Sequence, residues 1–82
     1  MDDFLIITCV HHTSENGDYY AYGPYVREMN LWIEKENSVS VVAPLMSETK
    51  PGKIDLKYKH KQLRFVTVPA YHVQSVQAIF KT

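Results

Sequence analysis

The sequence has a single cysteine and no net charge, and each of these limits the function. Cys9 has no partner for an internal disulfide, so nothing indicates an oxidising compartment, and its apolar neighbours favour a small buried side chain. Lys and Arg number 9, and Asp and Glu number 9. This balance gives no reason to expect a nucleic acid as partner, and it gives little electrostatic protection against self-association.

A targeting segment is also lacking. The chain begins with Met1-Asp2-Asp3, which is acidic where a signal peptide is basic. The apolar run from Phe4 to Val10 is far too short to span a bilayer. We therefore expect a cytoplasmic protein, and the length of 82 residues limits it to one domain, residues 1–82, or to part of one.

Glycine-rich phosphate-binding motifs are absent, since Gly17, Gly23 and Gly52 lie too far apart to form one. Without GxGxxG or GxxxxGK[ST], we expect neither a dinucleotide-binding enzyme nor a P-loop nucleoside triphosphatase. No pair of carboxylates is placed for acid–base catalysis, so the pattern identifies no catalytic residue and indicates no cofactor.

The chain does contain several apolar segments, each separated from the next by polar residues. The run at Phe4–Val10 does not alternate with polar residues, which predicts a strand buried on both faces. Apolar residues at three- and four-residue spacing predict a helix over Pro24–Glu36, with Gly23 as its N-cap. Further strands are expected at Val39–Ala43 and Leu63–Val68, and a second helix over Val73–Phe80.

This order predicts an α/β fold, namely a Rossmann-like partial domain. Its sheet would have three parallel strands in the order 3-2-1, with one clear crossover helix and a C-terminal helix. Residues 44–62 read as a long irregular loop. Phe4–Val10 would then lie at an uncovered edge, so we expect either a fragment of a larger fold or a chain that self-associates.

The candidate substrate-binding residues follow the first predicted strand: His11, His12, Tyr22, Gly23 and Pro24. In open α/β sheets, ligands bind outside the carboxyl ends of the strands. The turn at Gly23-Pro24 leads into a helix N-terminus, whose free N–H groups favour an anion. A plain capping turn is the alternative.

The adjacent histidines admit several roles. Their side chains leave a strand end in different directions, and His60 and His72 are remote, so we expect no metal site. We expect His11 and His12 either to line a sugar-binding cleft or to lie in a solvated loop. The tyrosines around the helix entry suit sugar faces as well as a core, and they are Tyr19, Tyr20, Tyr22 and Tyr25.

A basic cluster lies further along the chain, at Lys57, Lys59, Lys61 and Arg64. In an extended segment, the three lysines share one face. Such a cluster attracts a membrane surface or an anionic acceptor, and a solvated loop is the plain alternative.

Several of these segments together resemble the start of bacterial glycosyltransferases of family 4. They are Leu5-Ile6-Ile7 with His11-His12, then Tyr22–Met29, Val39–Pro44, Lys50–Leu56 and Thr67–Ala70. The resemblance covers nearly the whole chain. Its motifs are moderately specific, because a strand, a glycine turn and a helix occur in many Rossmann-like folds.

The resemblance implies a GT-B architecture, in which the N-terminal domain holds the acceptor and a C-terminal domain holds the nucleotide sugar. It implies a pair of donor-site glutamates, absent here, and no required metal. Gly23 matches the glycine of the first turn, and His11–Tyr22 match the loop before it. The double glycine common in the family is single here, which argues against a phosphate contact at that turn.

The expected function is therefore an acceptor-side fragment, inactive alone, of an enzyme that transfers a sugar to a polysaccharide or cell-envelope acceptor. The donor sugar, the acceptor and the stereochemistry stay open. A stand-alone interaction or regulatory domain that dimerises through its first strand is the alternative, and a small flavodoxin-like nucleotide-binding protein is a third.

Overall fold

The computed structural model describes residues 3–73 and 77–81. In chain order, its elements are β1 (Asp3–Thr8), β2 (Thr13–Glu15), β3 (Asp18–Tyr22), α1 (Gly23–Ile33), β4 (Ser38–Ala43), β5 (Asp55–Lys57), β6 (Leu63–Thr67), the short 3-10 helix η1 (Ala70–His72) and β7 (Gln77–Lys81).

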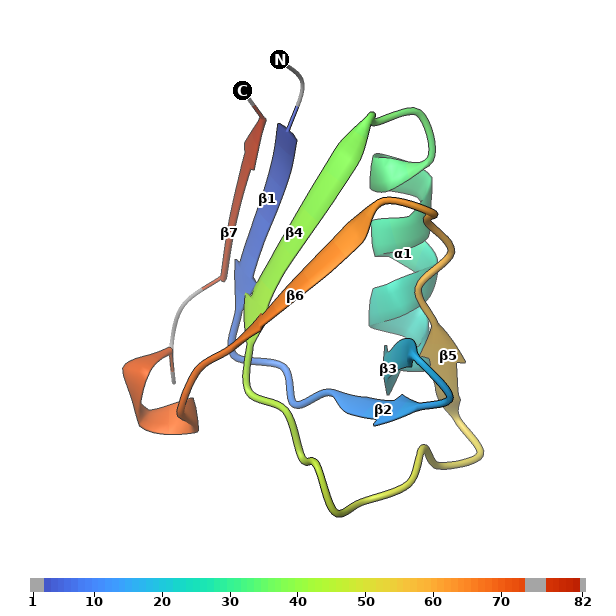
Figure 1. The fold of residues 1–82 in the computed structure, drawn as a ribbon, viewed down its shortest axis with the longest axis vertical. Coiled ribbons are helices and arrows are strands. Elements are labelled where there is room, and N and C mark those ends of the chain that lie inside the picture. The colour runs from blue at the N-terminus through green and yellow to red at the C-terminus, as the bar shows by residue number, and fades with distance from the viewer. Residues whose placement is uncertain (1–2, 74–76, 82) are drawn as a thin grey trace.

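The strands form two sheets. The larger sheet has the order β6-β4-β1-β7, in which β1, β4 and β6 are parallel and β7 runs antiparallel to β1. The smaller sheet, β2-β3-β5, is antiparallel throughout. Figure 1 shows α1 and the smaller sheet together on one side of the larger sheet. The described chain is thus mostly β-structure with a single α-helix.

The expected fold class, a three-stranded parallel Rossmann-like sheet, is wrong. Two segments overturn it: an antiparallel strand lies at 77–81, where a helix was expected, and a second sheet forms from segments expected to be loops. Residues 74–76 of the expected C-terminal helix lie outside the described part. β1 is paired on both sides, to β4 and β7, so the expected uncovered edge is also wrong.

The reason is the hydrogen-bonding demand of β1. A strand edge presents a row of unpaired N–H and C=O groups, and pairing satisfies them. β7 supplies this pairing over five residues, from Phe4↔Lys81 to Thr8↔Gln77. The helical spacing of apolar residues at Val73–Phe80 predicted a helix instead, because the need to pair the edge of β1 arises only in the folded sheet.

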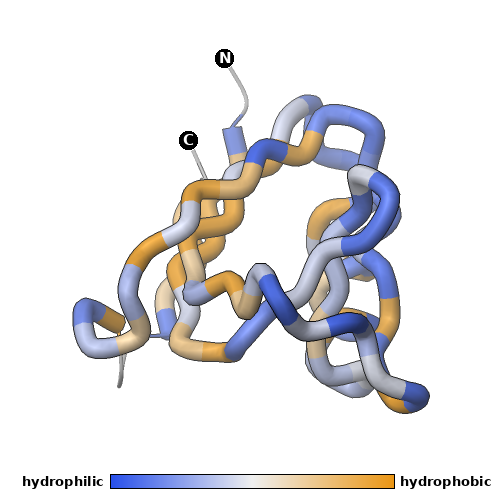
Figure 2. Tube along the Cα trace, turned by 60° about the horizontal axis from the view of Figure 1, so that its bottom comes forward, coloured by the Kyte–Doolittle hydropathy of each residue, from blue (hydrophilic) through white to orange (hydrophobic). Residues whose placement is uncertain are grey.

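The core lies between the larger sheet and α1. On β1, alternate residues are buried, and the residues between them are only partly covered. The fully or nearly fully buried apolar side chains of β1, α1 and β4 are Phe4, Ile6, Val26, Met29, Ile33, Val39, Val41 and Ala43. Figure 2 shows the most hydrophobic stretches along the strands of this sheet. The expectation that both faces of the first strand are buried therefore holds for one face only.

α1 begins one residue earlier and ends three residues earlier than the sequence pattern indicated. Tyr22, not Gly23, is its N-cap residue, and Gly23 is its first helical residue. The buried stripe is narrower than expected, because Trp32 is 55% exposed. Trp32 therefore lies on the outer side of the helix.

Part of the segment expected to be a loop before the helix is a β-hairpin. β2 and β3 pair from Thr13↔Tyr20 to Glu15↔Asp18. Asn16 and Gly17 make the turn, with φ of 54° and 84°. Two consecutive positive φ values define the tight hairpin turn that Asn-Gly favours.

Candidate functional site at the end of the first strand

The two adjacent histidines have opposite environments. His11 is exposed, whereas His12 is completely buried. The backbone of His12 bridges two segments: its N–H donates to the carbonyl oxygen of Pro44 at 3.0 Å, and its carbonyl accepts from Met46 N–H at 2.7 Å. The segment after β1 thus lies beside the segment after β4, at the carboxyl ends of both strands.

Hydrogen bonds fix the state of the His12 ring. Nδ1 lies 2.7 Å from the carbonyl oxygen of Val10, which can only accept, so Nδ1 carries the proton. Nε2 then accepts from the Tyr58 hydroxyl at 2.8 Å. The Tyr58 ring is parallel to the imidazole, and Phe65 meets it edge-on. The sequence did not indicate this pairing, since 46 residues separate His12 and Tyr58.

Burial makes both rings of this pair poor proton carriers. Desolvation is the largest cause that lowers the pKa of His12 to about 4, and the neighbouring His11 adds to it, while the hydrogen bond to Val10 opposes it. Desolvation also raises the pKa of the Tyr58 hydroxyl, with smaller contributions from Tyr25. At neutral pH both groups are uncharged, so the pair is suited to holding structure and not to exchanging protons with a substrate.

The pair belongs to a ring of polar contacts. Tyr25 contributes to the raised pKa of the Tyr58 hydroxyl, and Gln77 Nε2 donates to the Tyr25 hydroxyl at 3.4 Å. Thr8 Oγ1 donates to Gln77 Oε1 at 2.7 Å and accepts from Val10 N–H at 3.2 Å. We call this the polar ring, and it consists of Thr8, Val10, His12, Tyr58, Tyr25 and Gln77.

The polar ring ties four parts of the chain together. It joins the end of β1, the helix α1, the segment after β5 and the strand β7. Thr8, His12 and Tyr58 are its buried members, and each has a hydrogen-bond partner, whereas Gln77 is exposed. Next to it, Thr13 Oγ1 is buried and has no hydrogen-bond partner among the described residues.

The turn at Gly23-Pro24 differs from an open anion site. Gly23 is buried, and its N–H donates to the carbonyl oxygen of Ile54 at 2.9 Å. An added Cβ would collide with that oxygen, so glycine is required here for close approach of two backbone segments. One of the free N–H groups that would attract a phosphate is therefore already used.

The structure separates the five candidate site residues into two sets. His12 and Gly23 are buried and structural, whereas His11, Tyr22 and Pro24 are exposed. Tyr22 is 53% exposed, the extent expected of a side chain that can still meet a ligand. Of the five predicted binding residues, His11, Tyr22 and Pro24 are therefore accessible to a ligand.

The three lysines of the basic cluster, but not Arg64, line a cleft that the sequence did not predict. The cleft has a volume of about 700 Å³, and its walls come from the start of β3, the residues just after α1, and the end of β5 with the segment that follows it. Its lining residues are Asp18, Glu34, Glu36, Asn37, Lys57, Tyr58, Lys59, His60, Lys61 and Gln62. Lysine and carboxylate side chains are equally numerous there, so the cleft has no dominant charge.

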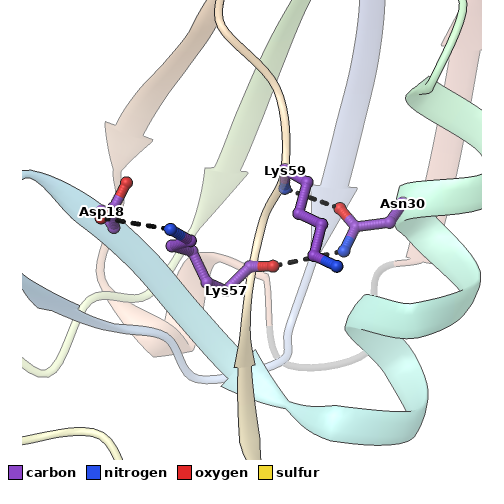
Figure 3. A network of polar contacts seen from close by, with 4 residues as sticks. All are labelled: Asp18, Asn30, Lys57 and Lys59. Carbon is purple, nitrogen blue, oxygen red and sulfur yellow. Dashed lines mark hydrogen bonds and ion pairs between the residues drawn. The ribbon is translucent and has the colours of Figure 1, made fainter.

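The backbone of this basic segment is held by α1. The Asn30 amide donates to the carbonyl of Lys57 at 3.2 Å and accepts from Lys59 N–H at 2.9 Å, as Figure 3 shows. His60 Nε2–H donates to the carbonyl of Glu36 at 2.7 Å. These bonds fix the backbone, and the lysine side chains remain exposed to solvent.

Comparisons with known proteins identify no relative. No family model, no curated protein and no solved structure matches the chain. Within residues 3–73 and 77–81, no group of three His, Cys, Asp or Glu side chains could hold a metal ion. The helices described are too short or too polar to cross a membrane.

Proposed function

We propose that the chain is the acceptor-side segment of a cytoplasmic glycosyltransferase. That enzyme transfers a sugar from a nucleotide sugar to a polysaccharide or cell-envelope acceptor. The nucleotide sugar is held by a part outside this sequence, and the chain is inactive by itself.

The observation that carries the proposal is the contact between two segments of the family resemblance. His11-His12 and Ala43-Pro44 both belong to it, and the His12 backbone bonds to Pro44 and Met46. The two matched segments therefore lie side by side at the carboxyl ends of β1 and β4, where His11 is exposed and His12 and Pro44 are buried. The proposal rests on this contact and on the resemblance of the matched segments. The Rossmann-like fold that the resemblance implies is not part of it, because the structure contradicts that fold.

The exposed side chains of the predicted loop, His11 and Tyr22, suit binding and not catalysis. Tyr22 offers an exposed ring, which stacks on the apolar C–H face of a sugar while its hydroxyl hydrogen-bonds. His12 is buried and held neutral, so it does not exchange protons with a substrate. Glycosyl transfer needs the donor and the acceptor positioned across a closed cleft, and one wall of that cleft cannot provide this.

Saturation-transfer difference NMR on the purified chain tests the proposal. The probes are maltotetraose, cellotetraose and a glucuronate-containing tetrasaccharide, with UDP-glucose as the donor probe. We expect transfer to at least one oligosaccharide, reduced at least threefold by Tyr22→Ala, and no turnover of UDP-glucose. Tyr71→Ala is the matched control, because Tyr71 is exposed to an even greater extent.

Two results would contradict the proposal. Turnover of UDP-glucose by the purified chain would show a complete active site. Absence of binding to all three oligosaccharides, or an equal loss in the Tyr71→Ala control, would remove the assignment of an acceptor surface around Tyr22.

A stand-alone interaction domain is the second candidate. Dimerisation by pairing along β1 is not available in this fold, because β4 and β7 occupy both edges. The less covered face of the larger sheet offers another route, since Phe80 is 51% exposed and Val66 43% exposed there. A dimer in light scattering that Phe80→Ser and Val66→Ser convert to monomer would favour this candidate.

A further inference from the structure

A second groove runs between α1 and the extended segment at 54–60. The segment follows the helix along its whole length: Ile54 bonds to Gly23 at the start of α1, Asn30 holds the middle, and His60 bonds to Glu36 just beyond its end. An extended chain from 54 to 60 spans roughly 20 Å, and thirteen helical residues span the same length. The groove is therefore fixed at one end by a backbone hydrogen bond, and in the middle and at the other end by bonds from the Asn30 and His60 side chains to backbone groups.

The walls of this groove combine cationic and apolar side chains. It has a volume of about 630 Å³. Its lining residues are Arg27, Asn30, Leu31, Glu34, Leu56, Lys57 and Lys59. Leu31 is 72% exposed, and Leu56 is also exposed. Both leucines thus line the same groove and are left uncovered by folding.

The charge of the groove is positive. Three cations, Arg27, Lys57 and Lys59, face a single carboxylate, Glu34. Lys57 also pairs with Asp18 at 3.8 Å, but both side chains are about half exposed, so solvent screens the pair strongly. Figure 3 shows the Lys57 ammonium turned toward Asp18 and the Lys59 side chain on the opposite side, next to Asn30.

We propose that this groove docks the protein onto an anionic phospholipid surface. The three cations meet lipid phosphates, and Leu31 and Leu56 enter between the headgroups. A surface of this kind matches both features at once, because anionic lipids attract basic side chains and the interface accepts apolar ones. A soluble polyanion would match the charges and leave both leucines in water. The inference does not depend on the proposed transferase function.

Vesicle co-sedimentation of the purified chain tests the proposal. The vesicles contain phosphatidylcholine alone or with 30% phosphatidylglycerol, at about 50 mM and about 500 mM salt. We expect binding only to the anionic vesicles at low salt. Each cation near the surface contributes roughly a fivefold factor, so R27Q/K57Q/K59Q should weaken binding by about a hundredfold. Leu31→Ser should weaken it by roughly tenfold.

The matched control is K50Q/K53Q/R64Q, which removes the same charge from three exposed positions outside the groove. It should bind within about threefold of the unaltered chain. Circular dichroism melts confirm that each variant is folded, and the salt dependence of the unaltered chain is an independent measurement should one variant unfold.

Four outcomes overturn the proposal. They are no binding of the unaltered chain to anionic vesicles, equal binding to neutral vesicles, equal weakening by the control triple substitution, and no effect of Leu31→Ser. Binding to heparin without binding to vesicles would assign the groove to a soluble polyanion and would also overturn it.

Discussion

His11 and His12 show how far one position along the chain changes the chemistry of a side chain. His12 turns inward at the end of β1, where Val10 and Tyr58 fix its tautomer, and His11 stays in solvent. The consequence is that His12 contributes to stability. Its imidazole must remain neutral in the folded chain, because no carboxylate among its bonded partners would stabilise the charged form.

Stability is therefore expected to fall in mildly acidic solution. The pKa of His12 is about 4 in the folded chain, against about 6.5 when unfolded. Between these values, His12 binds a proton in the unfolded chain but not in the folded chain. The contribution of His12 to the free energy of unfolding is therefore complete above pH 6.5 and is lost as the pH falls toward 4. The loss amounts to about 3 kcal/mol, with a slope of about 1.4 kcal/mol per pH unit.

Urea denaturation between pH 4.5 and 7 measures this slope. His12→Phe should flatten it, whereas His72→Phe should leave it in place, because His72 is exposed. An imidazole NMR titration of His12 supplies a second measurement that needs no variant. A midpoint near 6.5 for that ring would show that the ring is not desolvated and would contradict the account.

At the scale of elements, the junction between α1 and the segment before β5 depends on Gly23. Gly23→Ala would place a Cβ against the Ile54 carbonyl oxygen, so one of the two backbones must move. We expect a loss of about 1–3 kcal/mol in the free energy of unfolding, measured by urea denaturation. Gly52→Ala is the control, because its Cβ would meet only Asp55 Oδ2, at 3.6 Å. Equal effects of the two substitutions would contradict this role of Gly23.

Local sequence signals located some elements and missed others. The periodicity placed the helix and the strands β1, β4 and β6 to within a few residues, because those segments have long apolar patterns. Asn16-Gly17 is a strong hairpin signal that could have identified β2 and β3 and was read only as a loop. β5 is three residues long, and it exists because β3 and α1 lie beside it, which no local pattern records.

For the candidate site too, the sequence predicted some features and missed others. The sequence placed the loop at the carboxyl end of β1, and the structure keeps His11 and Tyr22 exposed there. It gave no sign that His12 would be buried against Tyr58, because that contact joins distant parts of the chain. The lysine cluster was visible, and the groove beside it depends on how Asn30 holds the backbone of Lys57 and Lys59.

At the scale of the whole molecule, β1 is the organising strand. It lies between β4 and β7, its end joins the polar ring, and the segment after it meets the segment after β4. Parallel strands are usually covered on both faces, yet α1 and the smaller sheet lie on one face of this sheet. The other face is where self-association or a larger assembly would bury Val66 and Phe80.

The position of β1 inside the sheet is the central structural claim, and NMR of the labelled chain tests it most directly. The account predicts slow amide exchange along β1 and cross-strand NOEs between Ile6 and Ile79, with extended chemical shifts over Gln77–Lys81. Helical shifts over Gln77–Lys81, together with fast exchange on one edge of β1, would contradict it.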